Sequence, residues 1–311
     1  MASNNLRDII FFSIKDHIID KDFYIVNADF TGRPFIAIAK EYSERFIQVG
    51  IAEQNMIAVA CGLALTGKKV VTYSPNPFEY LRAYDQIRNA VCMMGLPITI
   101  VANGYGLVNT NLGATHFTTE DYQLFSLCPN MQIFTISDEN IAKMVTDYIV
   151  NGVSSPTYVR IDFECDGVIA SEEDIDFNKG YRLIKRGKEC AIITQGYTVR
   201  TAIKADFLIQ PTIIEIFRRP YNQSMLLKEL QEYKKIIVLE EQQLRGGLGS
   251  ELLEICNQNR ITIDIECLGI DYGEQFPHMF GKREFWMKEF GIDSESLKEK
   301  VEKNYEKSIW R

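Results

Sequence analysis

The sequence predicts an α/β protein with two domains, each built on a mostly parallel sheet flanked by helices. Short runs rich in β-branched residues alternate with longer segments of helical apolar periodicity, which is typical of βαβ units. The length of 311 residues fits about two domains. A charged stretch interrupts the alternation once. We therefore expect a first domain at 1–165, a linker at 166–187 that holds at most a short strand, and a second domain at 188–311.

Six strands are expected in the first domain, at 23–29, 46–50, 69–74, 97–104, 131–137 and 157–163. Helical periodicity separates them at 53–66, 78–94 and 138–150. The stretch 51–65 is apolar on nearly every side, which indicates a helix enclosed by protein, including another subunit. Four further strands are expected in the second domain, at 190–196, 211–217, 234–241 and 261–269. The last segment, 294–310, has the pattern of an amphipathic helix with one packed side.

Composition excludes several classes of function. The formal net charge is −8, with no basic stripe, which argues against nucleic acid as a partner. Charges interrupt the apolar residues near the N-terminus, so we expect no signal peptide and no membrane span. Seven dispersed cysteines without C-x-x-C argue against a disulfide framework and favour a reducing cytoplasm. Three histidines are too few for a multi-histidine metal site, and we expect no metal ligands in this chain.

The stretch RFIQVGIAEQNMIAVACGLAL at 45–65 places Glu53 in the first turn of an apolar helix. Taken alone, such an acid is more often a helix-capping residue that favours the positive end of the helix dipole. The functional alternative is a carboxylate in an apolar setting, where it can hydrogen-bond and protonate a heterocyclic nitrogen.

The stretch SPNPFEYLRAYDQIRNAVCMMG at 74–95 places aromatic residues where a strand passes into a helix. Phe78 and Tyr80 lie beside Arg82 there. Such rings can stack on a planar ligand, although packing in the core is the commoner role.

The long loop GYGLVNTNLGATHFTTEDYQL at 104–124 carries His116. A lone loop histidine is more often a plain polar surface residue, but functional groups concentrate on such loops. The stretch VLEEQQLRGGLGSELLE at 238–254 has a glycine-rich turn before a helix. Its spacing fits neither common phosphate-binding loop, so close backbone packing or an interface is the better interpretation.

Together these stretches resemble the C-terminal half of transketolases and of the related deoxyxylulose-phosphate synthases. G-I-A-E-Q-N, R-A-Y-D-Q, G-A-T-H and L-E-E-Q-Q-L-R-G-G-L-G-S follow one another in the family's order, and the resemblance covers nearly the whole chain. It implies a pyrimidine-binding domain followed by a transketolase C-terminal domain, and a transfer of two-carbon ketol units that depends on thiamine diphosphate.

The resemblance also implies roles for single residues. Glu53 matches the glutamate that contacts the aminopyrimidine ring of the cofactor. Phe78 matches the aromatic residue that stacks on this ring, with Tyr80 as the alternative, and Arg82 lies in the same cofactor-binding stretch. His116 matches a histidine that faces the reactive oxygens of the substrate.

The family holds the diphosphate and Mg²⁺ through a G-D-G motif followed by an asparagine, and this chain has no G-D-G. The nearest string, C-D-G at 165–167, lacks the partner asparagine. The resemblance therefore implies the second subunit of a split, cytoplasmic transketolase. An N-terminal subunit would carry the G-D-G motif and hold most of the diphosphate and magnesium, in an expected α2β2 heterotetramer.

Substitutions in the substrate region suggest an altered sugar. Leu112, preceded by Asn111, stands where the family has an aspartate that recognises a substrate hydroxyl. Gly104 replaces a phosphate-binding histidine. Phe163 replaces a phosphate-binding arginine, with Arg160 as the nearest substitute. Because leucine accepts no hydrogen bond, we expect a modified sugar instead of a common pentose phosphate.

Two other functions stay open at this point. A decarboxylating, deoxyxylulose-phosphate-synthase-like subunit would consume pyruvate and release carbon dioxide. A scaffold subunit would keep the fold without catalysis, and the retained Glu53 and His116 argue against it.

Overall fold

The computed structural model describes residues 5–29, 31–163 and 167–309, without the side chains of 304–309. These residues form two compact units. The first unit comprises the chain up to Tyr105 and Leu124–Val168, and the second comprises Gly106–Gln123 and the chain from Ile169 onward. The predicted junction at 165 and 166 lies outside the described residues, as does most of the C-D-G string. The domain bounds therefore stay a prediction.

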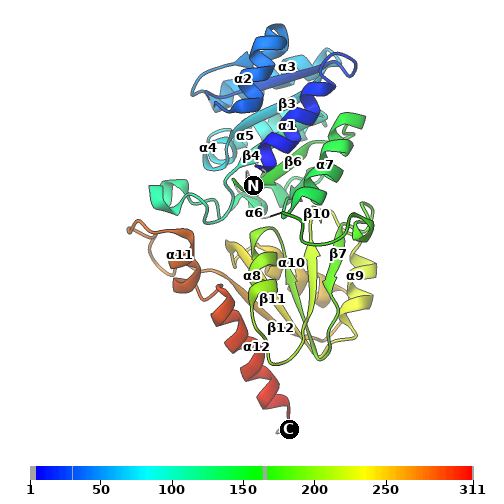
Figure 1. The fold of residues 1–311 in the computed structure, drawn as a ribbon, viewed down its shortest axis with the longest axis vertical. Helices are drawn as coiled ribbons and strands as arrows, with labels where there is room; N and C mark the ends of the chain where they lie inside the picture. Colours follow the sequence, from blue (N-terminus) through cyan, green and yellow to red (C-terminus); the bar gives the residue numbers. More distant parts are fainter. Residues whose placement is uncertain (1–4, 30, 164–166, 310–311) are drawn as a thin grey trace. The chain divides into compact units, whose positions relative to one another are not determined.

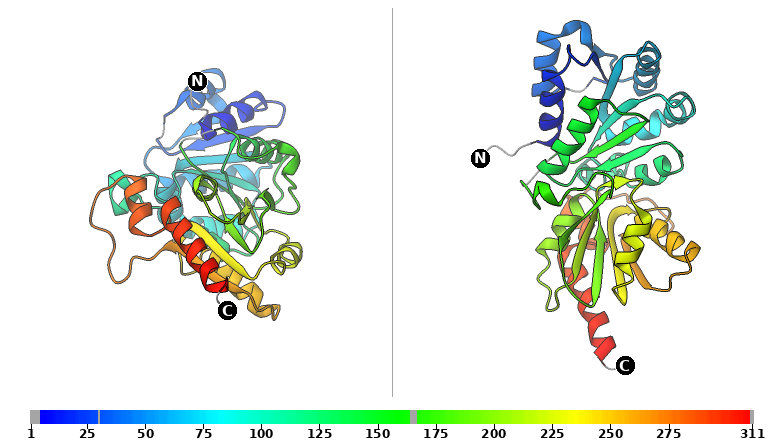
Figure 2. Two further views of the ribbon diagram at one scale, coloured as in Figure 1. Left: turned by 60° about the horizontal axis from the view of Figure 1, so that its bottom comes forward. Right: turned by 90° about the vertical axis from the view of Figure 1, so that its right-hand side faces the viewer.

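The first unit is built on a parallel sheet with helices on both sides (Figures 1 and 2). Its strands run in the order β5-β6-β4-β3-β1-β2, and each neighbouring pair is parallel. Every residue of the central strand β4 is buried, which explains the unbroken apolar run in the sequence. The strands are β1 Phe23–Asn27, β2 Phe46–Gln48, β3 Lys69–Pro75, β4 Ile98–Asn103, β5 Gln132–Thr135 and β6 Thr157–Ile161.

The helices of this region are α1 Leu6–Asp16, α2 Arg33–Glu41, α3 Glu53–Leu65, α4 Asn76–Arg82, α5 Tyr84–Gln86, α6 Asp121–Ser126 and α7 Glu139–Asn151. A short 3₁₀ turn occurs at Ser43–Arg45, and two more, at Thr110–Leu112 and Ala114–His116, lie in the Gly106–Gln123 segment of the second unit. The sequence analysis missed α1, which packs against α2 and α7. The helix predicted at 78–94 is instead divided into α4, α5 and a π-helix, Ile87–Cys92. Sequence periodicity does not reveal such breaks, because a π-helix changes only the spacing of the backbone hydrogen bonds.

The second unit contains a sheet in the order β12-β11-β8-β9-β7, in which only β7 is antiparallel to its neighbour. Ile192 and Ile237 belong to a hydrophobic cluster on one face, and Ile193 and Val238 to a cluster on the other. The strands are β7 Tyr181–Lys185, β8 Cys190–Thr194, β9 Thr212–Ile216, β11 Lys235–Gln243 and β12 Asp264–Ile270, with the two-residue β10 at Arg218–Arg219.

Strand β7 lies inside the segment predicted as a linker. Its Arg182 is opposite Glu215 of β9, and the Arg182 Nε donates to Glu215 Oε2 at 2.6 Å with both side chains fully buried. An internally paired arginine gives the strand a polar sequence, and this is why the charged composition suggested a linker.

The helices of the second unit are α8 Tyr197–Lys204, α9 Gln223–Leu230, α10 Leu248–Gln258, α11 Arg283–Glu289 and α12 Ser294–Ile309, with a 3₁₀ turn at Glu172–Asp174. The amphipathic C-terminal helix is confirmed as α12, because Leu297 and Val301 join the hydrophobic cluster of the unit. The α/β fold class is likewise confirmed. Among the described residues, no helix combines the length and apolarity that a membrane crossing requires.

Candidate functional site

Glu53 is the first residue of α3 and is largely buried. The chain leaves β2, turns at Gly50 with a φ of 76°, and enters the helix without a side-chain cap. Only 6% of the Glu53 side chain is exposed. Its carboxylate accepts hydrogen bonds from Arg82 Nη1, at 3.0 Å to Oε1 and 3.2 Å to Oε2. A simple surface cap would be open to water, so this burial favours a binding role.

Phe78 lies next to this ion pair. The Arg82 Cζ is 4.2 Å from the centre of the Phe78 ring, a cation–π arrangement. The two residues are four apart on α4 and therefore share one side of the helix. Phe78 is partly exposed, whereas Tyr80 is fully buried. Phe78, and not Tyr80, can therefore offer a ring face to a planar ligand.

The planar Arg82 guanidinium thus contacts a buried carboxylate and an aromatic ring at once. An aminopyrimidine needs the same two partners, because it is flat and carries ring nitrogens that hydrogen-bond to a carboxyl group. Glu53 and Phe78 therefore fit the pyrimidine half of thiamine diphosphate.

Glu79 is a second buried carboxyl group, which the sequence analysis missed. Thr72 Oγ1 donates to its Oε1 at 2.8 Å, while its buried Oε2 has no hydrogen-bond partner among the described residues. Burial raises the pKa of Glu79 well above its ordinary value, and the nearby charge of Glu53 raises it further. Burial therefore favours the neutral form of Glu79. An acid within a helix resembles any solvent-facing acid, so the sequence held no signal for it.

His116 lies in the 3₁₀ turn Ala114–His116 of the second unit and is partly exposed. Its Nδ1 is 3.0 Å from Thr115 Oγ1. Neighbouring residues anchor this loop: Thr119 O accepts from Gln243 N at 3.0 Å, and Thr119 Oγ1 is 2.8 Å from Tyr272 OH. The loop is therefore held in place around the histidine.

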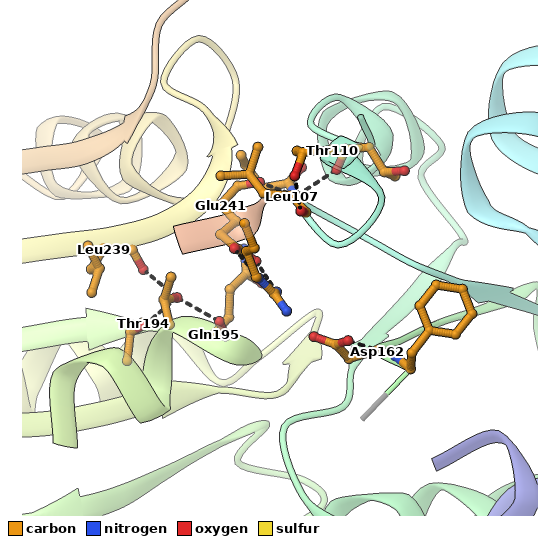
Figure 3. Close-up of polar contacts among 12 residues, drawn as sticks. Leu107, Thr110, Asp162, Thr194, Gln195, Leu239 and Glu241 are labelled. Atoms are coloured by element: carbon orange, nitrogen blue, oxygen red, sulfur yellow. Dashed lines mark hydrogen bonds and ion pairs between the residues drawn. The ribbon is translucent and has the colours of Figure 1, made fainter. Parts of the chain in front are cut away.

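The other loop residues in question are close to His116 in the chain. Asn111 and Leu112 are exposed in the turn Thr110–Leu112, with Leu112 50% exposed. Thr110 Oγ1 donates to Leu107 O at 3.0 Å at the base of the turn (Figure 3). Leu112 thus presents an apolar group to the surface, where an aspartate would present an acceptor.

The remaining candidate positions lie at strand ends of the first unit. Arg160 is 1% exposed, with its Nη1 3.1 Å from Thr135 Oγ1 and its Cζ 4.8 Å from the centre of the Tyr105 ring. These contacts hold Arg160 inside the first unit, and its predicted role in binding substrate stays a prediction. The Phe163 amide donates to Asp162 Oδ1 at 2.7 Å (Figure 3). Gly104 follows β4 with a φ of 92°.

The glycine-rich turn before α10 is filled from within the chain. Glu240 accepts hydrogen bonds from the amides of Leu248, at 2.8 Å, and Gly249, at 2.9 Å. A Cβ on Gly247 would lie 2.6 Å from Glu240 Oε2. The expected close backbone packing is confirmed, and the internal carboxylate occupies the position that a phosphate would need. Among the described residues, no group of three or more His, Cys, Asp or Glu could hold a metal ion.

Two domain profiles match this chain. The transketolase pyrimidine-binding domain matches residues 20–162, and the transketolase C-terminal domain matches residues 180–296. The chain belongs to the transketolase family. The family predicted from the sequence motifs is thereby confirmed, and with it membership of a thiamine-dependent group of transferases.

Similar proteins cover this transketolase-family chain almost from end to end. A subunit of the apulose-4-phosphate transketolase of Actinobacillus succinogenes is 31% identical over 89% of this chain and 90% of the relative. A putative transketolase C-terminal section of Methanocaldococcus jannaschii is 29% identical over 89% of this chain and 88% of the relative. A solved split-gene transketolase, described as an inactive β4 tetramer, superimposes with a TM-score of 0.82 over 97% of this chain and 98% of that one, at 24% identity.

Proposed function

We propose that this chain is the C-terminal subunit of a split transketolase, which transfers a two-carbon ketol unit between sugars. The observation that carries the proposal is the pairing of buried Glu53 with half-buried Phe78, bridged by Arg82. These are the groups that an aminopyrimidine requires, at the position where the family motif places them.

The chain's own residues would act as follows. Glu53 would accept and return a proton at a pyrimidine nitrogen, Phe78 would support the ring, and Arg82 would move off both groups when the ring binds. His116 would hydrogen-bond to a sugar oxygen. Thiamine diphosphate, when bound, supplies the carbon nucleophile of its thiazolium ring.

We further propose that a partner subunit with the G-D-G motif holds the diphosphate and Mg²⁺, in a cytoplasmic α2β2 assembly. Two relatives support a divided enzyme, one named as a subunit of a transketolase and the other as a C-terminal section. Exposed apolar side chains at the ends of α3 and on α4 also support it, since Ile51 is 75%, Leu65 61% and Leu81 54% exposed. Large apolar side chains left exposed in this way would be covered by another chain. The proposed division of the chain is 1–165, 166–187 and 188–311.

The proposed substrate is a modified sugar phosphate. Exposed Leu112 cannot accept a hydrogen bond from a hydroxyl, and Asn111 beside it offers only a neutral amide. One relative is named as a subunit of an apulose-4-phosphate transketolase, and this name supports an unusual sugar as the substrate proposed here.

Binding of thiamine diphosphate with Mg²⁺ tests the proposal, measured by calorimetry with this chain alone and after mixing with a separately encoded N-terminal subunit. Binding only in the mixture supports the split enzyme. Tight binding by this chain alone, or no binding in either case, contradicts it. A ketol-transfer assay on the mixture then separates transketolase from the alternative synthase, which would consume pyruvate and release carbon dioxide. Fast turnover of xylulose 5-phosphate with ribose 5-phosphate would contradict the modified sugar.

A further inference from the structure

Two cysteines far apart in the sequence meet in the first unit. Cys92 ends the π-helix Ile87–Cys92, and Cys128 follows α6 just before β5. Both thiols are free and buried, and both cysteines line one cavity. Their surroundings hold them together, because Asn130 Nδ2 donates to the carbonyl of Cys92 at 2.7 Å.

The pair also has a route to solvent. A surface cavity of about 360 Å³ is lined by both cysteines together with Arg88 and Asn130. This volume admits a small polar oxidant easily, since one water molecule occupies about 30 Å³ in the liquid. The cavity is not used by the proposed ketol transfer.

We propose that Cys92 and Cys128 form a redox-active dithiol, which peroxide converts reversibly into an intramolecular disulfide. The proposal depends on the geometry of the first unit and stands independently of the transketolase function.

The two thiols are chemically unequal, as a reactive pair requires. The interaction with Cys92 is the largest cause that lowers the pKa of Cys128, and together with Tyr84 and the charge of Arg88 it brings this pKa to about 7 against the opposing effect of burial. The same interaction and burial raise the pKa of Cys92. Near neutral pH Cys128 is therefore substantially a thiolate, and Cys92 keeps its proton.

The oxidation balances with hydrogen peroxide as the oxidant. The Cys128 thiolate attacks one peroxide oxygen, the O–O bond breaks, and hydroxide leaves and takes up a proton as water. Cys128 is now a sulfenic acid. The Cys92 sulfur attacks the Cys128 sulfur, the S–O bond breaks, and the proton of Cys92 leaves with the hydroxyl as a second water. Two thiols and one peroxide give one disulfide and two waters, and a dithiol reductant reverses the change.

Other cysteines of the described chain lack this reactivity. Burial alone raises the pKa of Cys61 to about 11, and burial is the largest cause for Cys190, also raised to about 11. These thiols stay protonated at neutral pH, so they serve as internal controls.

The experiment uses the full chain with Cys165→Ser, because that cysteine lies outside the described residues. The chain is reduced, treated with one equivalent of hydrogen peroxide, alkylated after denaturation and mapped by mass spectrometry. We expect two alkylation sites to be lost, a linked peptide pair containing Cys92 and Cys128, and recovery of both sites with dithiothreitol. Full alkylation of both, stable sulfinic acid on Cys128, or only intermolecular links would overturn the proposal.

Two variants sharpen the result. Cys92→Ser removes the thiol that lowers the pKa of Cys128, so this pKa should rise and no linked peptide should form. The pKa is measured by thiolate absorbance against pH. Cys190→Ser, in the second unit, is the matched control and leaves both readouts unchanged. The same pKa for Cys128 with and without Cys92 would contradict the pairing. If Cys92→Ser folds poorly, peptide mapping of the chain that retains both cysteines still shows whether the disulfide forms.

Discussion

The replacement Glu53→Gln tests the candidate site most directly, because it changes charge without changing size. The amide keeps one oxygen that can accept from Arg82 Nη1, now 3.0 Å from Oε1. The Arg82 side chain is 48% exposed, so water screens the ion pair. We therefore expect a loss of unfolding free energy of only about 0.5–1 kcal/mol.

The expected effect on chemistry is far larger. A positioned acid–base group contributes about 10²- to 10⁴-fold to a proton transfer. At about 1.36 kcal/mol for each factor of ten, this corresponds to about 2.7–5.4 kcal/mol of the barrier. Glutamine cannot take up and return a proton, so the whole of this contribution should be lost.

The assay measures exchange of the thiamine C2 proton for deuterium by NMR in the mixture with the partner subunit, and urea unfolding of this chain alone. Glu41→Gln is the matched control, because Glu41 also pairs with a cation, Lys15 at 2.7 Å, but is about half exposed. Glu53→Gln should slow exchange strongly while Glu41→Gln does not. Exchange within twofold of the unmodified chain would refute the reasoning, and so would a stability loss large enough to explain the inactivity.

Three further predictions concern stability. Glu79→Gln should flatten the dependence of stability on pH. Because the pKa of Glu79 is raised in the folded chain, the stabilisation that its neutral form provides is complete below the ordinary pKa of 4.5 and is lost as the pH rises above it. Urea midpoints measured across a pH series would show this loss in the parent chain. A parent chain that does not weaken in this way would contradict the assignment. Glu215→Ala should cost about 3–5 kcal/mol of unfolding free energy, because it leaves the fully buried Arg182 unpaired. The double change Arg182→Met with Glu215→Leu should recover most of that loss. Equal losses in the single and the double variant would contradict this account of the ion pair. Gly247→Ala should cost about 1–3 kcal/mol of unfolding free energy, because the new Cβ would lie 2.6 Å from a carboxylate oxygen. The control Gly62→Ala lies in open space on α3 and should be neutral or stabilising. Similar thermal midpoints for the two variants would show that the turn before α10 is not tightly packed.

The strand positions and the fold class followed from the sequence because they depend on local pattern. Runs of β-branched residues mark buried parallel strands whichever neighbours they acquire, as in the fully buried β4. The motif around Glu53 also identified the family without any coordinates. The sequence alone thus determined the architecture, the family and the residues on which the cofactor proposal depends.

Only the tertiary structure decided which side chains meet, because such contacts join residues that are distant in the chain. It distinguished half-buried Phe78 from buried Tyr80, which lie two residues apart and point to different sides of α4. It brought Arg182 of a charged segment into the sheet by pairing it with Glu215. Cys92 and Cys128 look like ordinary apolar residues in the sequence, and only packing converts them into a pair. Local pattern specifies an element, but burial and ionisation depend on what the rest of the chain places against it.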